Sequence, residues 1–138
     1  MTDWAALETP LFQEPRFWME PTDRDPASEL TRQARFIGAI ERALPGVVVA
    51  AIPNAAKRGQ KALNQAKKEG ALWGFPDLAV IHAGRSAYLE FKAGRAKPKQ
   101  HQIDAMNRIH DQGVPVALVR TTEGAMRFLK QQGFAIDG

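Results

Sequence analysis

Two short apolar segments joined by a tight turn constrain the fold of this chain more than any other feature. Residues 77–82 read DLAVIH and residues 86–92 read SAYLEFK, with Ala83-Gly84-Arg85 between them. Both segments have the length and the β-branched and aromatic content of strands, and a short glycine-containing connection is typical of a hairpin. The apolar residues on either side of Glu90 favour a central position for the second strand. The chain is therefore expected to form a sheet around this hairpin.

Helical and apolar segments alternate on both sides of the hairpin. Their order, α-β-α-β-β-α-β-α, predicts an α/β fold in which helices flank a mixed central β-sheet. Asp25 is expected to cap the first helix, with Pro26 at its first position and Leu30 on its inner face. The expected helices cover residues 25–44, 60–69, 98–112 and 122–132, and the expected strands cover residues 47–52, 77–82, 86–92 and 114–121.

Residues 1–24 differ in character from the rest of the chain. Three prolines among them exclude a long helix, while large apolar residues such as Trp4 and Phe17 argue against a disordered tail. We expect this segment to be an N-terminal strap that docks on the domain formed by residues 25–138 or on a second subunit.

Composition excludes several classes of protein. The chain of 138 residues contains no cysteine, which rules out disulfides and thiolate metal sites and is natural in a reducing compartment. Its first residues lack the basic and apolar regions of a signal peptide. No apolar run approaches the length needed to cross a membrane. We therefore expect a soluble, cytoplasmic protein with no membrane partner.

Charge is distributed unevenly along the chain. Residues 1–29 hold seven acidic residues and two arginines, a balance of −5, which leaves +9 on residues 30–138 because the net charge is +4. A basic body with a pI near 9.7 favours a polyanionic partner, most simply nucleic acid. The alternative is that the basic surface serves solubility alone.

The hairpin gathers charged side chains on one face of the sheet. Alternate residues of a strand share a face, so Glu90 and Lys92 point one way while Leu89 and Phe91 point into the core. A two-residue turn places Asp77 opposite Glu90, and a four-residue loop places it opposite Lys92. Both registers put the two carboxylates and the lysine on one surface.

Two carboxylates held this close repel each other unless a cation lies between them. Hard oxygen ligands with open coordination positions suit Mg²⁺ or Mn²⁺, and such an ion polarises a phosphoryl oxygen and acidifies a bound water. Lys92 adds a positive charge that orients the attacking water or stabilises the transition state. Together with the basic surface, this set of groups points to phosphodiester hydrolysis.

The same residues carry a resemblance to a known family. Pro76-Asp77, a hairpin and then Glu90-x-Lys92 resemble the signature of the PD-(D/E)XK nuclease superfamily. The chain more narrowly resembles its VRR-NUC branch, of the stand-alone phage and bacterial type, over residues 28–133. Further matching positions are Glu29, Ile52-Pro53-Asn54, Glu69-Gly70, Gly74-x-Pro76-Asp77-Leu78, Gly94-Arg95, Gln100 and Gly113.

The resemblance implies a restriction-endonuclease-like core and a role for each matched residue. Asp77 and Glu90 would be metal ligands together with the Phe91 backbone carbonyl, and Lys92 would be the catalytic lysine. Glu29 would bind a second ion or its water from the first helix, and Gln100 would orient Lys92 or a phosphate oxygen. The expected DNA contacts are Asn54, Lys57, Arg58, Lys61, Arg95, Lys97 and Lys99.

The resemblance also implies a Mg²⁺- or Mn²⁺-dependent endonuclease that cuts branched or Holliday-junction DNA as a homodimer, with no small-molecule cofactor. Two positions depart from the family pattern. Lys97 stands where the family often has a serine that caps the helix, and Leu72 stands where a basic residue is frequent. Neither position is a metal ligand, so the departures concern DNA contacts.

Other interpretations compete with this one. The chain could be a nucleic-acid-binding module that does not cut, or a subunit that needs a partner for activity. A phosphatase or nucleotide-binding enzyme is disfavoured, since no glycine-rich phosphate loop is present. Asp77 could be a plain turn residue, Glu29 an acid favoured by the helix dipole, and Gln100 a surface residue.

The basic segment at residues 55–70 is either a solvated helix face or an arm that contacts phosphates. Trp73 is expected in the core, the alternative being that it stacks on a base. The three histidines lack the spacing of a zinc site and are expected at the surface, with His101 near DNA.

Overall fold

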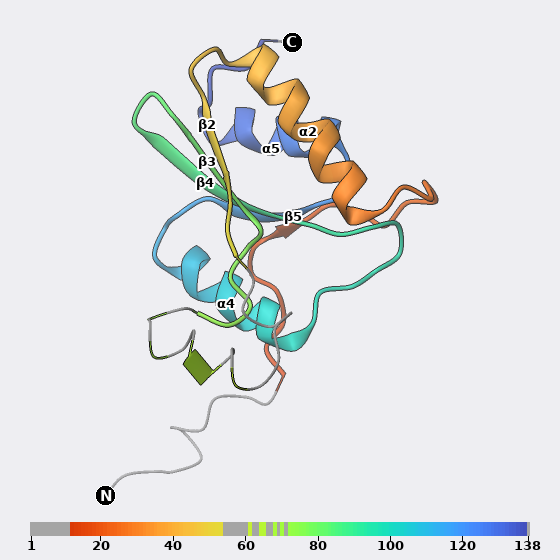
Figure 1. Ribbon diagram of the computed structural model, residues 1–138, viewed down its shortest axis with the longest axis vertical. Helices are drawn as coiled ribbons and strands as arrows, with labels where there is room; N and C mark the ends of the chain where they lie inside the picture. Colours follow the sequence, from red (N-terminus) through yellow and green to blue (C-terminus); the bar gives the residue numbers. More distant parts are fainter. Residues whose placement is uncertain are drawn as a thin grey trace, which may run out of the picture.

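The computed structural model describes residues 12–53, 61, 64, 65, 68, 70 and 72–137. A five-stranded sheet has the order β1-β5-β4-β3-β2 (Figure 1). Its strands are β1 (Trp18–Met19), β2 (Val48–Ala51), β3 (Leu78–His82), β4 (Arg85–Phe91) and β5 (Val116–Val119). The helices whose bounds lie within the described residues are α2 (Glu29–Ala43), α4 (Gln100–Asp111) and α5 (Thr122–Gln131). The helix expected over residues 60–69 falls largely outside the described residues. The predicted α/β fold, a mixed central sheet flanked by helices, is confirmed. Within the described residues, no helix has the length and apolar character needed to cross a membrane.

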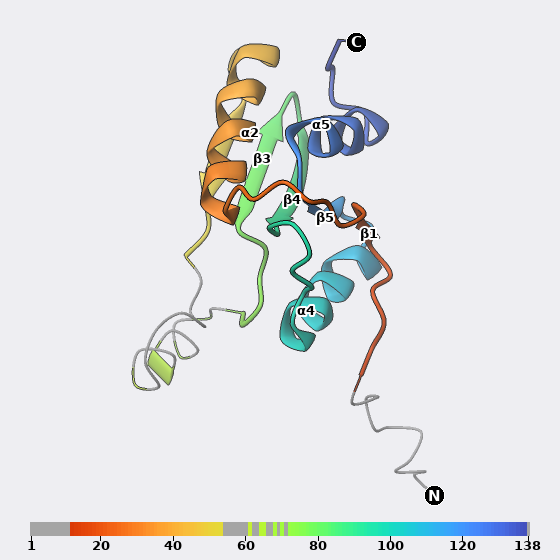
Figure 2. The same cartoon turned by 90° about the vertical axis from the view of Figure 1, so that its right-hand side faces the viewer.

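The sheet mixes antiparallel and parallel pairs. β2, β3 and β4 are antiparallel neighbours, while β5 runs parallel to β4 and β1 runs parallel to β5. Figure 2 shows β1 passing beside β5 before the chain continues to α2. The sequence did not predict β1, because two residues are too few to show a strand period. Its pairing extends to the Glu20 N–H, which donates to the Leu118 carbonyl at 2.9 Å.

Apolar side chains cover both faces of the sheet. On one face, α2 and α5 lie together (Figure 1) and pack on Leu89 and Phe91 of β4, both fully buried as predicted. On the other face, α4 packs through Met106 on Val116 and Leu118 of β5. Two buried layers explain why the strands around the hairpin are apolar on both sides, as is typical of central strands.

Two details of the first helix differ from the prediction. α2 begins at Glu29 rather than at residue 25, because the Ser28 hydroxyl accepts a hydrogen bond from the Thr31 N–H at 3.1 Å and caps the helix. Asp25 lies outside the helix and accepts from the Ala27 N–H instead. Leu30 was expected on the inner face but is 75% exposed.

The segment before α2 docks on the same chain. Its Phe17 side chain is buried with Met106 of α4 and with Val116 and Leu118 of β5. The Asn107 side chain of α4 accepts from the Arg16 N–H at 2.7 Å and donates to the Glu14 carbonyl at 2.9 Å. The described part of this segment, residues 12–24, therefore contacts the domain formed by the rest of the chain.

Candidate active site

The turn between β3 and β4 decides which residues of the hairpin face each other. It has two residues, with positive φ angles of 50° and 78°, which match the twist of a two-residue hairpin. The register ends at Leu78 opposite Leu89, so the next pair outward is Asp77 and Glu90. Of the two registers that the sequence allowed, the structure has the one that brings the two carboxylates face to face.

Glu90 is buried in an environment that disfavours its charge. Its side chain is 2% exposed, and its Oε2 accepts a hydrogen bond from Gln102 Nε2 at 3.2 Å. Its Oε1 is buried without a hydrogen-bond partner. Burial, and then the neighbouring Asp77 carboxylate, raise the pKa of Glu90 to about 9. In the metal-free protein, this carboxyl group therefore holds a proton at neutral pH.

Lys92 lies between Glu90 and the first turn of α2. Its Nζ is 3.8 Å from Glu29 Oε1 and 4.0 Å from Glu90 Oε2, and the lysine side chain is only 9% exposed. Glu29 comes directly after the Ser28 cap, so the start of α2 fixes its place beside the lysine. The structure thus brings together four of the residues predicted for the site, namely Asp77, Glu90, Lys92 and Glu29.

The glutamine that reaches this cluster is Gln102, which the sequence analysis missed. Its side-chain oxygen accepts from the Lys99 N–H at 2.9 Å, and its nitrogen donates to Glu90. Gln100 was expected to orient Lys92 or a phosphate oxygen, but its amide nitrogen donates to the Gln13 carbonyl and to Asp104. The predicted helix start at Pro98 is two residues too early, since α4 begins at Gln100. A helix starting at Gln100 puts Gln102 in the first turn, where its oxygen can cap the helix.

Pro76 explains how the Phe91 carbonyl could serve as a ligand. The Asp77 carbonyl accepts from the Ile52 N–H at 2.7 Å, so the backbone groups of residue 77 point toward β2. The groups of residue 76 then point toward β4, opposite Phe91. A proline there has no N–H to donate, so the usual ladder bond to the Phe91 carbonyl cannot form.

The two carboxyl groups and the Phe91 carbonyl fit an ion such as Mg²⁺, which keeps several waters, better than a metal whose ligands all come from protein side chains. Among the described residues, no three or more acidic or histidine side chains gather into a metal site. Asp77 and Glu90 instead offer two carboxylates, with the Phe91 carbonyl as a third oxygen. Mg²⁺ is usually held by one or two carboxylates plus waters and substrate phosphates. The unpartnered Glu90 Oε1 supplies the buried polar atom that such an ion would satisfy.

The predicted DNA contacts fall into two groups. Arg95, Lys97 and Lys99 lie in the segment between β4 and α4, and all three are exposed. They follow Lys92 within seven residues, so the segment that leaves the site carries three exposed positive charges. Lys61 is also exposed. The other three predicted contacts lie outside the described residues: Asn54, Lys57 and Arg58.

Trp73 was expected in the core and is instead 41% exposed. Its ring stacks on that of His101, with the centroids 4.4 Å apart and the planes 11° from parallel. His101 is the residue before Gln102, which donates to Glu90, and Gly74 rests on the backbone of residues 101 and 102, so the aromatic pair lies at the first turn of α4.

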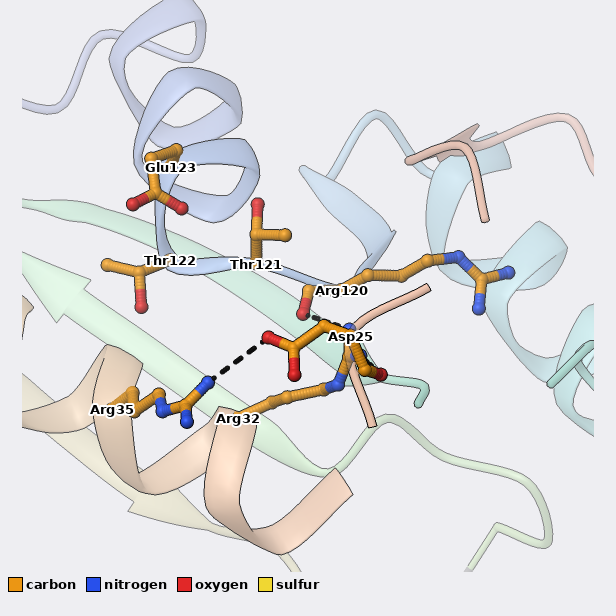
Figure 3. Close-up of a pocket in the computed structure, with 7 residues that line it drawn as sticks. All are labelled: Asp25, Arg32, Arg35, Arg120, Thr121, Thr122 and Glu123. Carbon is orange, nitrogen blue, oxygen red and sulfur yellow. Dashed lines mark hydrogen bonds and ion pairs between the residues drawn. The ribbon is translucent and has the colours of Figure 1, made fainter. Parts of the chain in front are cut away.

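A pocket of about 200 Å³ lies between the starts of α2 and α5 (Figure 3), and none of its lining residues belongs to the carboxylate site. Its two buried arginines are engaged by the protein. Arg32 forms an ion pair with Asp23 at 2.7 Å and donates to the Arg120 carbonyl at 2.8 Å. The Arg120 side chain donates to the carbonyls of residues 93, 94 and 96. These contacts hold the chain that follows Lys92, so we interpret the pocket as part of the framework.

Comparison with known proteins adds one finding. No protein-family model matches the sequence, and no curated protein matches it. Among solved structures, a VRR_NUC domain protein superposes on this chain with a TM-score of 0.60 at 16% sequence identity. The superposition covers 76% of this chain and 87% of the VRR_NUC domain protein. At this identity the likeness concerns the fold, and the chain has the fold of that VRR_NUC domain protein.

Proposed function

We propose that this chain is a metal-dependent nuclease of the VRR-NUC type, which hydrolyses phosphodiester bonds of DNA. The observation that carries the proposal is the buried contact of Asp77 with Glu90, in which one Glu90 oxygen lacks a partner beside the amino group of Lys92. Placing two carboxyl groups in contact, one of them buried and unable to ionise at neutral pH, costs stability unless a ligand offsets that cost. A domain that only binds DNA has no need of this arrangement. The shared fold and the net charge of +4 support the same function.

Each residue has a defined task in this proposal. Asp77, Glu90 and the Phe91 carbonyl would hold Mg²⁺ or Mn²⁺, which supplies polarisation of a phosphoryl oxygen and a more acidic water when bound. Lys92 donates to the attacking water or to the phosphoryl oxygens as negative charge develops on them. Glu29 orients Lys92 and is the available ligand for a second ion. The proton held by Glu90 must leave when both carboxylates act as ligands, so metal binding releases a proton.

The finer assignment rests on the resemblance described above. We place the chain with the stand-alone phage and bacterial members of the PD-(D/E)XK superfamily, as an endonuclease that cuts branched DNA such as Holliday junctions. One domain holds one such site, and cutting both strands of a junction needs two. The proposal therefore includes a homodimer.

The test compares active-site variants with a matched control. Asp77→Asn and Lys92→Ala should each lower cleavage of labelled linear, flapped, splayed and four-way DNAs in Mg²⁺ or Mn²⁺ by roughly 10²- to 10³-fold or more. Binding in Ca²⁺ should persist, because the exposed basic residues remain. Asp111→Asn is the control, since it removes an acid of α4 that is 45% exposed and paired with Arg16.

The outcomes separate the competing interpretations. Normal cleavage by the Lys92→Ala and Asp77→Asn proteins would show that the site is wrongly assigned. A wild-type protein that binds these DNAs but cuts none of them in either metal would be a binding module or a subunit that needs a partner.

A further inference from the structure

Trp73 and His101 form an exposed aromatic surface that the proposed chemistry does not use. The indole is 41% exposed, and its ring lies nearly parallel to the imidazole at 4.4 Å. Large aromatic side chains are usually buried or engaged at an interface. An exposed indole backed by a second ring therefore has the form of a contact surface for another flat group.

The turn that carries Trp73 is fixed in place on α4. Gly74 has a φ of +85°, and a Cβ at this position would lie 2.3 Å from the His101 carbonyl oxygen. Only glycine allows the turn to rest this closely on the first turn of the helix. The next residue, Phe75, packs edge-on against Tyr88 of β4, with the centroids 5.3 Å apart. The indole is therefore presented by a rigid support.

The surface lies beside the carboxylate site and is flanked by cations. Trp73 precedes the ligand candidate Asp77 by four residues, and His101 is adjacent to Gln102, which binds Glu90. Burial lowers the pKa of His101, and the positive charges of Lys99 and Lys92 lower it further. Both lysines are thus close enough to act on the ring. An aromatic surface among cations suits a base whose neighbouring phosphates are neutralised at the same time.

We propose that Trp73, supported by His101, stacks on an unpaired nucleobase of the DNA strand whose phosphate enters the carboxylate site. This inference rests on the proposed nuclease function and narrows its substrate. A base inside a continuous duplex has both faces covered by its neighbours, so it offers nothing to the indole. The preferred DNA therefore has unpaired bases beside the cut, as in a flap, a splayed arm or an opened junction.

Trp18 provides a matched control for the binding test. It is 39% exposed and stacks on Phe128, but it lies on β1 at the edge of the sheet. In EDTA, where no cleavage occurs, Trp73→Ala should weaken binding of single-stranded DNA by roughly 5- to 150-fold, the equivalent of one stacked base. Trp73→Phe should retain most of the affinity, and Trp18→Ala should match the wild type.

Fluorescence gives a readout that does not depend on cleavage. A Trp4→Phe/Trp18→Phe protein keeps Trp73 as its single tryptophan, and a Trp4→Phe/Trp73→Phe protein keeps Trp18. Oligothymidine should quench the first protein strongly and the second little, and a blunt duplex of equal length should quench neither to that extent. Circular dichroism checks that each variant is folded.

The result that would overturn the inference is equal quenching of the two single-tryptophan proteins. Unquenched Trp73 in a protein that still binds the oligonucleotide would also overturn it, and would point to a protein partner for the aromatic surface. Neither result touches the nuclease proposal. A third result separates the two proposals. If oligothymidine quenches Trp73 but the wild-type protein cuts none of the DNAs, base stacking is retained and the nuclease proposal is refuted.

Discussion

Two buried charged clusters lie in this small domain, and they differ in how completely their charges are matched. In the arginine cluster, Arg32 and Arg120 are engaged by Asp23 and by backbone carbonyls. In the carboxylate cluster, which comprises Asp77, Glu90, Lys92 and Glu29, one oxygen of Glu90 is buried without a partner. Both clusters carry the desolvation cost of buried charge. In the arginine cluster, hydrogen bonds and ion pairs within the protein offset this cost. In the carboxylate cluster, the unpartnered Glu90 oxygen leaves part of the cost to be offset by a ligand.

The difference shows which cluster serves the fold and which serves chemistry. The arginine contacts connect the segment before α2, the loop after β4 and the start of α5. Their removal should therefore cost stability. The carboxylate cluster lies where β3 begins and β4 ends, and its removal should cost activity but not stability. The three predictions below test this contrast, from the largest expected effect to the smallest.

The arginine cluster should respond most strongly to a loss of charge. Arg32→Ala should lower the free energy of unfolding by about 3–5 kcal/mol, because it leaves Asp23 and several carbonyls without their donor. Urea denaturation measures this. The control is Arg35→Ala on the same helix, whose ion pair with Asp25 is exposed on both sides and should be worth less than about 1 kcal/mol. Equal effects of the two substitutions would mean that the arginine cluster does not stabilise the fold.

Gln102 should matter to the carboxylate cluster and Gln100 should not. Gln102→Leu keeps the volume of the side chain but removes the donor to Glu90 Oε2. Loss of a group that orients a metal ligand typically costs 10- to 100-fold in activity or metal affinity, so we expect cleavage to fall by roughly that factor. Gln100→Leu, two residues away, should change cleavage little. If the Gln100 variant lost more activity than the Gln102 variant, Gln100 would have the role expected from the sequence, which is to orient Lys92 or a phosphate oxygen.

The third effect concerns pH, and it is the smallest of the three when it is expressed per pH unit. The pKa of Glu90 is about 9 in the folded protein and 4.5 in its unperturbed form. Between these values the folded state holds a proton that the unfolded state has lost. The free energy of unfolding of the metal-free protein should therefore fall as pH rises, by at most about 1.4 kcal/mol per pH unit. Above about pH 9 this decline should end.

Glu90→Gln, neutral at every pH, should remove this dependence and raise Tm at pH 8. Thermal unfolding in EDTA between pH 5 and 9 makes the comparison. Added Mn²⁺ should then stabilise the wild type but not the variant, because only the wild type can ionise to bind it. The same pH slope in both proteins would indicate that Glu90 is ionised in the folded state.

Most of the fold and the centre of the candidate site could be predicted from the sequence. The hairpin made this possible. Side chains alternate between the two faces of a strand, so Glu90 and Lys92 share a face whatever the length of the turn. Changing the turn by two residues moves Asp77 along that face but not off it. The turn type itself was beyond the sequence, since alanine with positive φ at the first turn position is uncommon.

The missed features depend on contacts between distant residues. Gln102 and Gln100 lie in the same helix turn, and only the packing of α4 on the sheet decides which of them meets Glu90. Ser28 rather than Asp25 caps α2, and the Asp25 side chain instead accepts from the Ala27 N–H and pairs with Arg35. Trp73 was assigned to the core by its residue type, but the close approach of Gly74 to α4 keeps the indole outside.

The pairing of β1 with β5 has a consequence for how the molecule assembles. Glu20 binds the backbone N–H of Arg120, a contact 100 residues apart in sequence. During synthesis, the early segment must wait until the last strand of the sheet has left the ribosome. Contacts of such wide separation slow folding, since a long loop must close before they form. The edge of β5 meanwhile stays open to other chains, so the nascent domain should be most prone to aggregation just before this closure.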